Sequence, residues 1–157
     1  MYSVRLFNKT ERKQAMIKKY SDEKRKEVIA ARKAALMAWE IAEMGRLGEA
    51  LGGKRSTFSG LSGIGDLIVT CCSGHSRNRY VGEELGRGKK LATILNDMGM
   101  VVAEGVPTAK GIRFLAKQKN VDVPLIEEIY KVLYEDRSAS EAILSLMTRE
   151  AKNEDEW

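Results

Sequence analysis

The segment of residues 21–53 constrains the fold most, because it is long, contains no proline and is rich in helix-forming residues. Ser21 is a suitable N-cap, and the two acidic residues after it favour the positive end of a helix dipole. From Val28 onward Ala, Leu, Met and Glu dominate until the pair Gly52-Gly53, which is typical of a helix end. The sequence therefore predicts one long helix.

The middle of this segment is apolar on more than one helical face, from residue 34 through Trp39 to Met44. Such a pattern is typical of a helix packed on several sides. We therefore expect this helix to be central, with Trp39 buried. Gly45 and Gly48 lie three residues apart within it, and they indicate either the close approach of another backbone or plain tolerance of glycine.

Composition favours an all-α fold. The 157 residues, 43% of them hydrophobic, suit one domain with a buried core. The two prolines both lie beyond residue 100, and aromatic residues make up only 6% of the chain, which argues against a β-sandwich or barrel.

Residues 56–88 are rich in glycine and predict short helical turns, and a helix is expected from Ser76 to about residues 86–88. Further helices are expected at residues 91–97, 108–119, 124–134 and 141–152, the last after a capping box at Ser138 and Glu141. Only residues 100–103 are expected to be extended.

The net charge of +5 is distributed unevenly. Residues 1–33 hold eleven Lys and Arg against four Asp and Glu, a net +7, whereas residues 34–157 hold 16 against 18, a net −2. A solvated helix face explains such a basic run more often than a binding site does. Nucleic acid is therefore not expected as a partner.

The cysteine content and the hydropathy exclude several classes of protein. Cys71 and Cys72 are adjacent, so an ordinary disulfide between them would be strained, and the single His75 leaves a metal site short of ligands. No apolar stretch approaches the roughly 20 residues of a membrane span, and residues 1–13 lack the apolar core of a signal peptide. We expect no metal, no membrane association and a cytoplasmic location.

Two glycine-rich stretches fail as nucleotide-binding motifs. Gly60, Gly63 and Gly65 do not have the spacing of a dinucleotide fingerprint and follow no predicted strand; we expect them to form a tight turn with positive φ. The stretch of residues 82–90 has five residues between its outer glycine pair and no Ser or Thr after the lysines, so it is not a Walker A loop.

The segment Ser73-Gly-His-Ser-Arg-Asn-Arg79 is the best candidate for a binding site. If a helix begins at Ser76, its unpaired backbone N–H groups and the positive end of its dipole gather at one spot with the Ser76 hydroxyl, the Arg77 guanidinium and the Asn78 amide. This combination predicts a phosphate or carboxylate site, although Ser76 as a simple cap with solvated arginines remains an equal alternative. Asp66 could accept a hydrogen bond from a substrate hydroxyl or cap a helix. His75 has no visible catalytic partner.

Five segments in order resemble a known family. They are residues 47–53, residues 57–71 (Thr-Phe-Ser-Gly-Leu-Ser-Gly-Ile-Gly-Asp-Leu-Ile-Val-Thr-Cys), residues 76–79 (Ser-Arg-Asn-Arg), residues 102–106 (Val-Ala-Glu-Gly-Val) and residues 124–134. Together they resemble the C-terminal, substrate-binding domain of bacterial NAD(P)-dependent glycerol-3-phosphate dehydrogenase, from about residue 34 to residue 152. The resemblance implies an all-helical domain similar to that of the phosphogluconate dehydrogenase superfamily.

The resemblance also implies roles for individual residues. Asp66, Ser76, Arg77 and Asn78 would contact glycerol 3-phosphate or dihydroxyacetone phosphate, and Arg77, Val102 and Glu104 would contact NAD or NADP. The implied reaction is reversible hydride transfer between NAD(P)H and dihydroxyacetone phosphate, which serves phospholipid biosynthesis.

The sequence departs from the family pattern at its N-terminal side. The Rossmann domain has no counterpart, and residues 1–33 are expected to form a basic helical extension unlike the family. Lys26 lies in a segment that differs from the family's lysine motif, so no catalytic lysine is assigned. We therefore expect an inactive chain that binds substrate weakly and holds no cofactor tightly, with a homo-oligomer left open. The alternative is a non-enzymatic helical scaffold or interaction module with a basic N-terminal helix.

Overall fold

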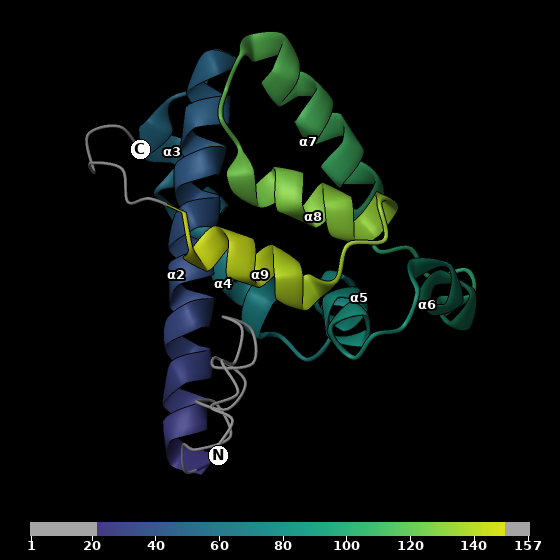
Figure 1. The fold of residues 1–157 in the computed structure, drawn as a ribbon. Coiled ribbons are helices and arrows are strands. Elements are labelled where there is room, and N and C mark those ends of the chain that lie inside the picture. Colours follow the sequence, from purple (N-terminus) through teal and green to yellow (C-terminus); the bar gives the residue numbers. More distant parts are fainter. Residues whose placement is uncertain (1–21, 150–157) are drawn as a thin grey trace, which may run out of the picture. The chain divides into compact units, whose positions relative to one another are not determined.

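All regular elements among residues 22–149, the part of the chain that this computed structural model describes, are helices. The elements are α2 (Asp22–Ala50), α3 (Arg55–Phe58), the short π-helix η1 (Leu61–Gly65), α4 (Asp66–Cys72), α5 (Arg77–Gly86), α6 (Leu91–Met98), α7 (Gly105–Lys119), α8 (Pro124–Tyr134) and α9 (Ala139–Met147) (Figure 1). The expected all-α fold is confirmed. None of the described helices is long and apolar enough to cross a membrane.

The chain divides into two units, residues 1–36 and residues 37–157. In the first unit the structure describes only the beginning of α2, where Lys24 Nζ lies 3.0 Å from Glu27 Oε2. Ile29 is exposed there, and Val28 is half-buried. The rest of the expected basic extension, residues 1–21, lies outside the described residues, as does the end of the last expected helix.

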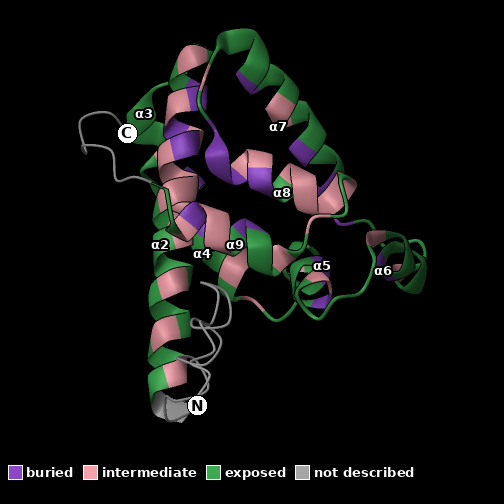
Figure 2. Cartoon of the chain, viewed as in Figure 1, coloured by how far each residue is buried: buried purple, intermediate pink, exposed green. Residues whose placement is uncertain are grey.

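The second unit contains two small hydrophobic cores. One joins α5, α6 and the beginning of α7 through the buried residues Val81, Ile94, Ala103 and Val106. The other joins the end of α2 to α7 and to the segment before α8 through Leu47, Ala116 and Val123. Helix α8 packs against both α7 and α9, and its buried beginning is visible in Figure 2.

The structure differs from the expectation for the long helix. Trp39 is only half-buried, so its predicted burial is wrong. Within the second unit the buried side chains of α2 are Glu43 and Leu47, which lie toward its C-terminal end. Among the described residues, the buried side chains of α2 therefore lie beyond Trp39 along the helix.

Gly48 in α2 and Gly63 after it serve close packing rather than positive φ. A Cβ on Gly48 would lie 2.1 Å from the ring of Phe58, and one on Gly63 would lie 2.0 Å from the carbonyl oxygen of Phe58. The expected positive φ at Gly60, Gly63 and Gly65 is wrong, because the positive-φ glycines are Gly52, Gly88 and Gly99. The turn at residues 61–65 is a π-helix. Glycine is required there because Gly63 lies against the Phe58 backbone, and not because the chain adopts a left-handed conformation.

Several helix boundaries shift by a few residues. Helix α7 begins at Gly105 and not at Thr108, because Pro107 is tolerated within a first helical turn. Helix α9 begins at Ala139, directly after Ser138, and its capping box with Glu141 is confirmed. Residues 100–103 form an irregular connection without a strand.

Candidate functional site

The candidate site begins at the N-terminus of α5. Ser76 is the N-cap with extended backbone angles, and its Oγ accepts a hydrogen bond from the Arg79 N–H at 3.2 Å. Just before it, Ser73 Oγ accepts a hydrogen bond from the His75 N–H at 3.1 Å. The predicted cap is therefore present, and the short connection from α4 is held by its own side chains.

Arg77 differs from the other arginines of this helix. Arg79 donates to Glu83 Oε1 at 2.7 Å and to the Cys72 carbonyl oxygen at 2.9 Å, and Arg87 pairs with Glu84. The Arg77 guanidinium, in contrast, makes no ion pair or hydrogen bond to any residue in 22–149, and Arg77 is exposed. A cation without an internal partner beside a helix N-terminus is suited to an external anion.

Asn78 connects the start of α5 to the start of α7. Its Oδ1 accepts a hydrogen bond from the Gly105 N–H at 3.0 Å. A Cβ on Gly105 would lie only 2.9 Å from the Asn78 side chain, so a larger residue there would displace that side chain. The bond uses one lone pair of the amide oxygen, and the amide nitrogen donates no hydrogen bond to another described residue.

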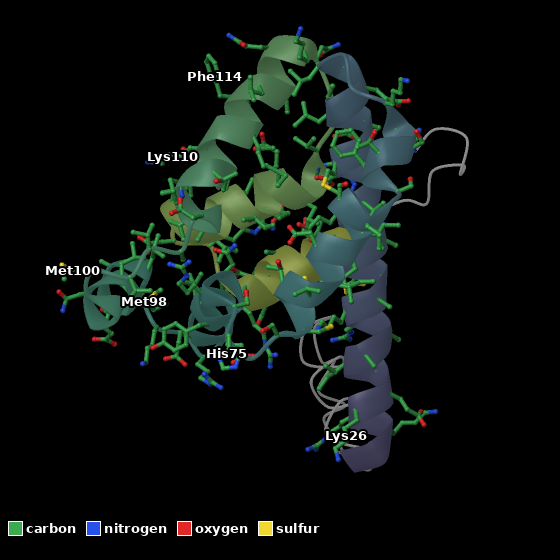
Figure 3. The ribbon with its side chains drawn as sticks, turned by 180° about the vertical axis from the view of Figure 1, so that it is seen from behind. Lys26, His75, Met98, Met100, Lys110 and Phe114 are labelled. Atoms are coloured by element: carbon green, nitrogen blue, oxygen red, sulfur yellow. The ribbon has the colours of Figure 1, made fainter. Side chains whose placement is uncertain are left out.

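An open cavity of about 340 Å³ lies beside this helix start. That volume is within the range of small-molecule sites. It is lined by Gly74, His75, Ser76, Arg77, Tyr80, Asp97, Met98 and Val101. Figure 3 labels His75 just before α5 and Met98 at the end of α6, the two regions that form the walls. Most of the polar groups come from α5 and the connection before it, whereas Met98 and Val101 supply an apolar side.

The structure brings together only part of the predicted set. Ser76 and Arg77 line the cavity, and Asn78 lies beside Glu104 because it binds the next backbone N–H. Asp66 is the exposed first residue of α4, which packs against α5, but it does not line the cavity. The N-cap of α4 is Gly65, so Asp66 is not a cap. Val102 is exposed in the connection before α7 and also lies outside the cavity lining.

Residues from α6 were missed by the sequence analysis. Asp97 and Met98 reach the cavity from helix α6, about twenty residues after Arg77. Asp97 also lies 3.8 Å from Lys89, which pairs with the buried Glu84. No local motif marks these positions, because their role depends on how α6 packs on α5. Among the described residues, no group of three His, Cys, Asp or Glu is arranged to hold a metal ion.

A second missed residue is the buried Glu43 of α2. Its carboxylate accepts hydrogen bonds from the backbone N–H groups of Leu125, at 2.6 Å, and Ile126, at 3.2 Å. Burial raises the pKa of Glu43 from 4.5 to about 7, and the two hydrogen bonds and Arg46 oppose that rise. Helix α8 has no side-chain cap of its own, so Glu43 caps it from another helix. This carboxylate therefore has a structural explanation apart from the cavity.

Comparison with known proteins identifies the family to which the chain belongs. The family described as NAD-dependent glycerol-3-phosphate dehydrogenase C-terminus matches residues 24–144. A glycerol-3-phosphate dehydrogenase of Chlorobium phaeobacteroides is 52% identical over 122 residues, which cover 78% of this chain and 36% of the relative. The corresponding protein of Staphylococcus saprophyticus is 55% identical over 122 residues, with the same coverage of both chains.

A solved structure supports the same relationship. The crystal structure of glycerol-3-phosphate dehydrogenase from Coxiella burnetii matches with a TM-score of 0.73 and 34% identity, over 76% of this chain and 36% of that one. This chain thus spans little more than a third of the length of the relatives it matches. The family model matches most of this chain, the relatives are about half identical to it in sequence, and the solved structure has the same helical fold. The chain therefore belongs to the family of NAD-dependent glycerol-3-phosphate dehydrogenase C-terminal domains.

Proposed function

We propose that the start of α5 binds the phosphate group of glycerol 3-phosphate or dihydroxyacetone phosphate. The observation that carries this proposal is the guanidinium of Arg77, which has no internal partner in residues 22–149 and lies at a capped helix N-terminus on an open cavity. The backbone N–H groups, the helix dipole and the guanidinium all favour an anion there. The names of the relatives supply the substrate class.

The other predicted residues would orient the rest of the substrate. Asn78 holds α5 against α7 through Gly105, and its amide nitrogen is a donor for a substrate oxygen. Asp66 would accept a hydrogen bond from a substrate hydroxyl. In the parent reaction such positioning lowers the barrier by fixing the reacting carbon toward the cofactor. By analogy, the product would serve phospholipid biosynthesis in the cytoplasm.

The described residues do not by themselves fit a whole dinucleotide. They contain no strand, and therefore no glycine-rich strand-to-helix turn of the kind that holds a pyrophosphate. Arg77, Val102 and Glu104 are exposed and could form only one edge of a site for NAD or NADP. We propose that this chain alone binds substrate weakly and does not catalyse the reaction.

An NMR titration with phosphate, sulfate and glycerol 3-phosphate tests the phosphate site. We expect the amides of residues 76–79 to shift with a dissociation constant of about 1 mM, which corresponds to about −4 kcal/mol. Arg77→Ala should weaken binding by about one to two decades, since hydrogen bonds to charged groups contribute about 1.5–3 kcal/mol. Arg77→Lys should recover only part of the affinity, because an ammonium cannot form the bidentate contact.

Lys117→Ala is the matched control. It removes one exposed positive charge from α7, outside the cavity lining, and should leave the affinity unchanged. Equal shifts in wild type and Arg77→Ala, or no shifts at residues 76–79, would show that this chain has no such site.

A further inference from the structure

Two cysteines occupy the last two positions of α4, directly before the candidate site. Cys72 is exposed and Cys71 is half-buried. From their position we propose that the two thiols form a vicinal disulfide on reaction with a small-molecule disulfide, and that this bond uncouples the end of α4 from the start of α5. The effect on ligand affinity rests on the proposed phosphate site, whereas the disulfide itself does not.

The α-helical backbone cannot hold this disulfide, so forming the bond must change the conformation of the end of α4. Consecutive Cα atoms are about 3.8 Å apart across a trans peptide, whereas most disulfides join Cα atoms about 4.4–6.8 Å apart. Consecutive side chains of an α-helix also point about 100° apart around its axis. Closing the ring therefore requires the last turn of α4 to unwind.

The last turn of α4 borders a segment that already leaves the helical conformation. The last turn is closed by a hydrogen bond from the Ser73 N–H to the Val69 carbonyl oxygen at 2.8 Å, and Ser73 itself already has an extended ψ of 132°. A strained disulfide is more easily reduced than an ordinary one. The pair therefore has the properties of a reversible thiol switch rather than of a structural crosslink.

A single arginine transmits the change to α5. The Cys72 carbonyl oxygen accepts a hydrogen bond from Arg79 Nη1 at 2.9 Å, and the Arg79 N–H donates to Ser76 Oγ at 3.2 Å. Arg79 thus joins the last carbonyl of α4 to the N-cap of α5. Rotation of the peptide planes around Cys72 removes that acceptor, and it also displaces the connection that carries Gly74 and His75 along the cavity wall.

The chemistry is two successive thiol–disulfide exchanges. The thiolate of Cys72, the more exposed residue, attacks one sulfur of the external disulfide and releases one thiolate. The thiolate of Cys71 then attacks the Cys72 sulfur of this mixed disulfide and releases the second thiolate. The protein loses two electrons and two protons, and the external disulfide is reduced to two thiols.

The first experiment treats the 157-residue chain with oxidised glutathione and measures the intact mass without reductant. We expect the wild type to lose the mass of two hydrogen atoms and to regain it with dithiothreitol. Cys71→Ser should instead retain one glutathionyl group, because Cys72 then has no resolving thiol. A wild-type chain that retains glutathione at Cys72, or does not react, would overturn the proposal.

The second experiment measures the coupling without any ligand. In NMR spectra, the Arg79 Nη1–H groups and the amides of residues 73–79 should shift on oxidation of the wild type, and should not respond in Cys71→Ser/Cys72→Ser. A disulfide that leaves these signals unchanged would show that the two helices are not coupled. Because no ligand is added, this result is independent of the proposed function.

Phosphate titration of the same samples completes the test. Oxidised wild type should bind phosphate about five- to tenfold more weakly than reduced wild type, which is the loss expected for one ordinary hydrogen bond that positions the site. Equal affinity in both forms overturns the regulatory part of the proposal. If the reduced chain does not bind phosphate at all, the proposed function fails, whereas the mass and the Arg79 signal still test the switch.

Discussion

The buried carboxyl group of Glu43 links the stability of the fold to pH. Its pKa is raised from 4.5 to about 7, chiefly by burial, so the folded chain binds this proton more tightly than the unfolded chain does. The resulting stabilisation is fully present below pH 4.5 and is lost as pH rises through 7. Glu40 shifts in the same direction through burial, whereas the pKa values of Glu84 and Glu141 are lowered, so their stabilisation is lost only under acid conditions.

We predict that Glu43→Gln removes a large part of this pH dependence. Between pH 4.5 and 8 the free energy of unfolding of the wild type should fall by as much as about 3 kcal/mol from this group. The amide of glutamine does not titrate, and its oxygen can still accept the bond from the Leu125 N–H. Urea denaturation at several pH values measures the slope. Glu49→Gln, an exposed change in the same helix, is the control, and an unchanged slope in Glu43→Gln would contradict the assignment.

At the same scale, the sequence identified one side of the cavity but not the other. Ser76 and Arg77, which line the cavity, could be singled out from the sequence because a cap and its following residue form a local pattern. Asp97 and Met98 could not, because they reach the cavity only through the packing of α6 on α5. Glu43 left one local signal: no capping residue precedes Pro124, so the first N–H groups of that helix needed an acceptor from elsewhere.

Among the elements, helices with strong local signals were predicted most accurately. The bounds of α8 match the expected residues 124–134, because Pro124 occupies its first turn. The burial of Trp39 was predicted incorrectly, since an apolar helix segment does not show where along its length the partner helices lie. The π-helix at residues 61–65 brings Gly63 against the Phe58 carbonyl group, a contact that glycine spacing alone does not reveal.

The capping box of α9 gives a prediction at the element scale. Ser138 Oγ accepts from the Glu141 N–H at 3.2 Å, and the Glu141 carboxylate accepts from the Ser138 N–H at 3.3 Å. Ser138→Ala should lower the free energy of unfolding by about 1 kcal/mol, because the cap bond is lost. Ser140→Ala, an exposed change two residues later, should change it by less than about 0.5 kcal/mol. Chemical denaturation with equal m-values would measure both, and equal effects would exclude the cap as the cause.

Helix α6 is anchored by one fully buried side chain. Ile94 has no exposed surface and packs with Val81, Ala103 and Val106. Ile94→Ala should cost about 2–5 kcal/mol, through lost transfer energy and the cavity left behind. Leu95→Ala removes a similar side chain that is 36% exposed and should cost clearly less. Thermal unfolding of both variants tests this order, and a Leu95 effect as large as that of Ile94 would contradict the described core.

At the scale of the whole chain, the basic segment of residues 1–33 lies partly outside the family match, which begins at residue 24. The +7 charge of that segment should give only weak binding to DNA or RNA. Binding through about 6–10 phosphate contacts should fall by orders of magnitude between 50 and 200 mM salt. Fluorescence anisotropy with two unrelated oligonucleotides measures this dependence. Tight, sequence-selective binding at physiological salt would instead favour the interaction-module alternative.

The last prediction concerns catalysis by the chain as a whole. The chain spans 36% of the length of its relatives. Its described residues offer only one side of a site that would hold both substrate and cofactor. Orientation of two reactants supplies about 7–11 kcal/mol of a barrier, and that contribution is lost when nothing holds the nicotinamide beside the substrate carbon. We therefore expect no measurable oxidation of NADH or NADPH by the purified 157-residue chain with dihydroxyacetone phosphate, with a full-length relative as positive control. Turnover that Arg77→Ala abolishes would contradict this expectation and would locate a complete active site in this chain, since a contaminating enzyme would not respond to that substitution.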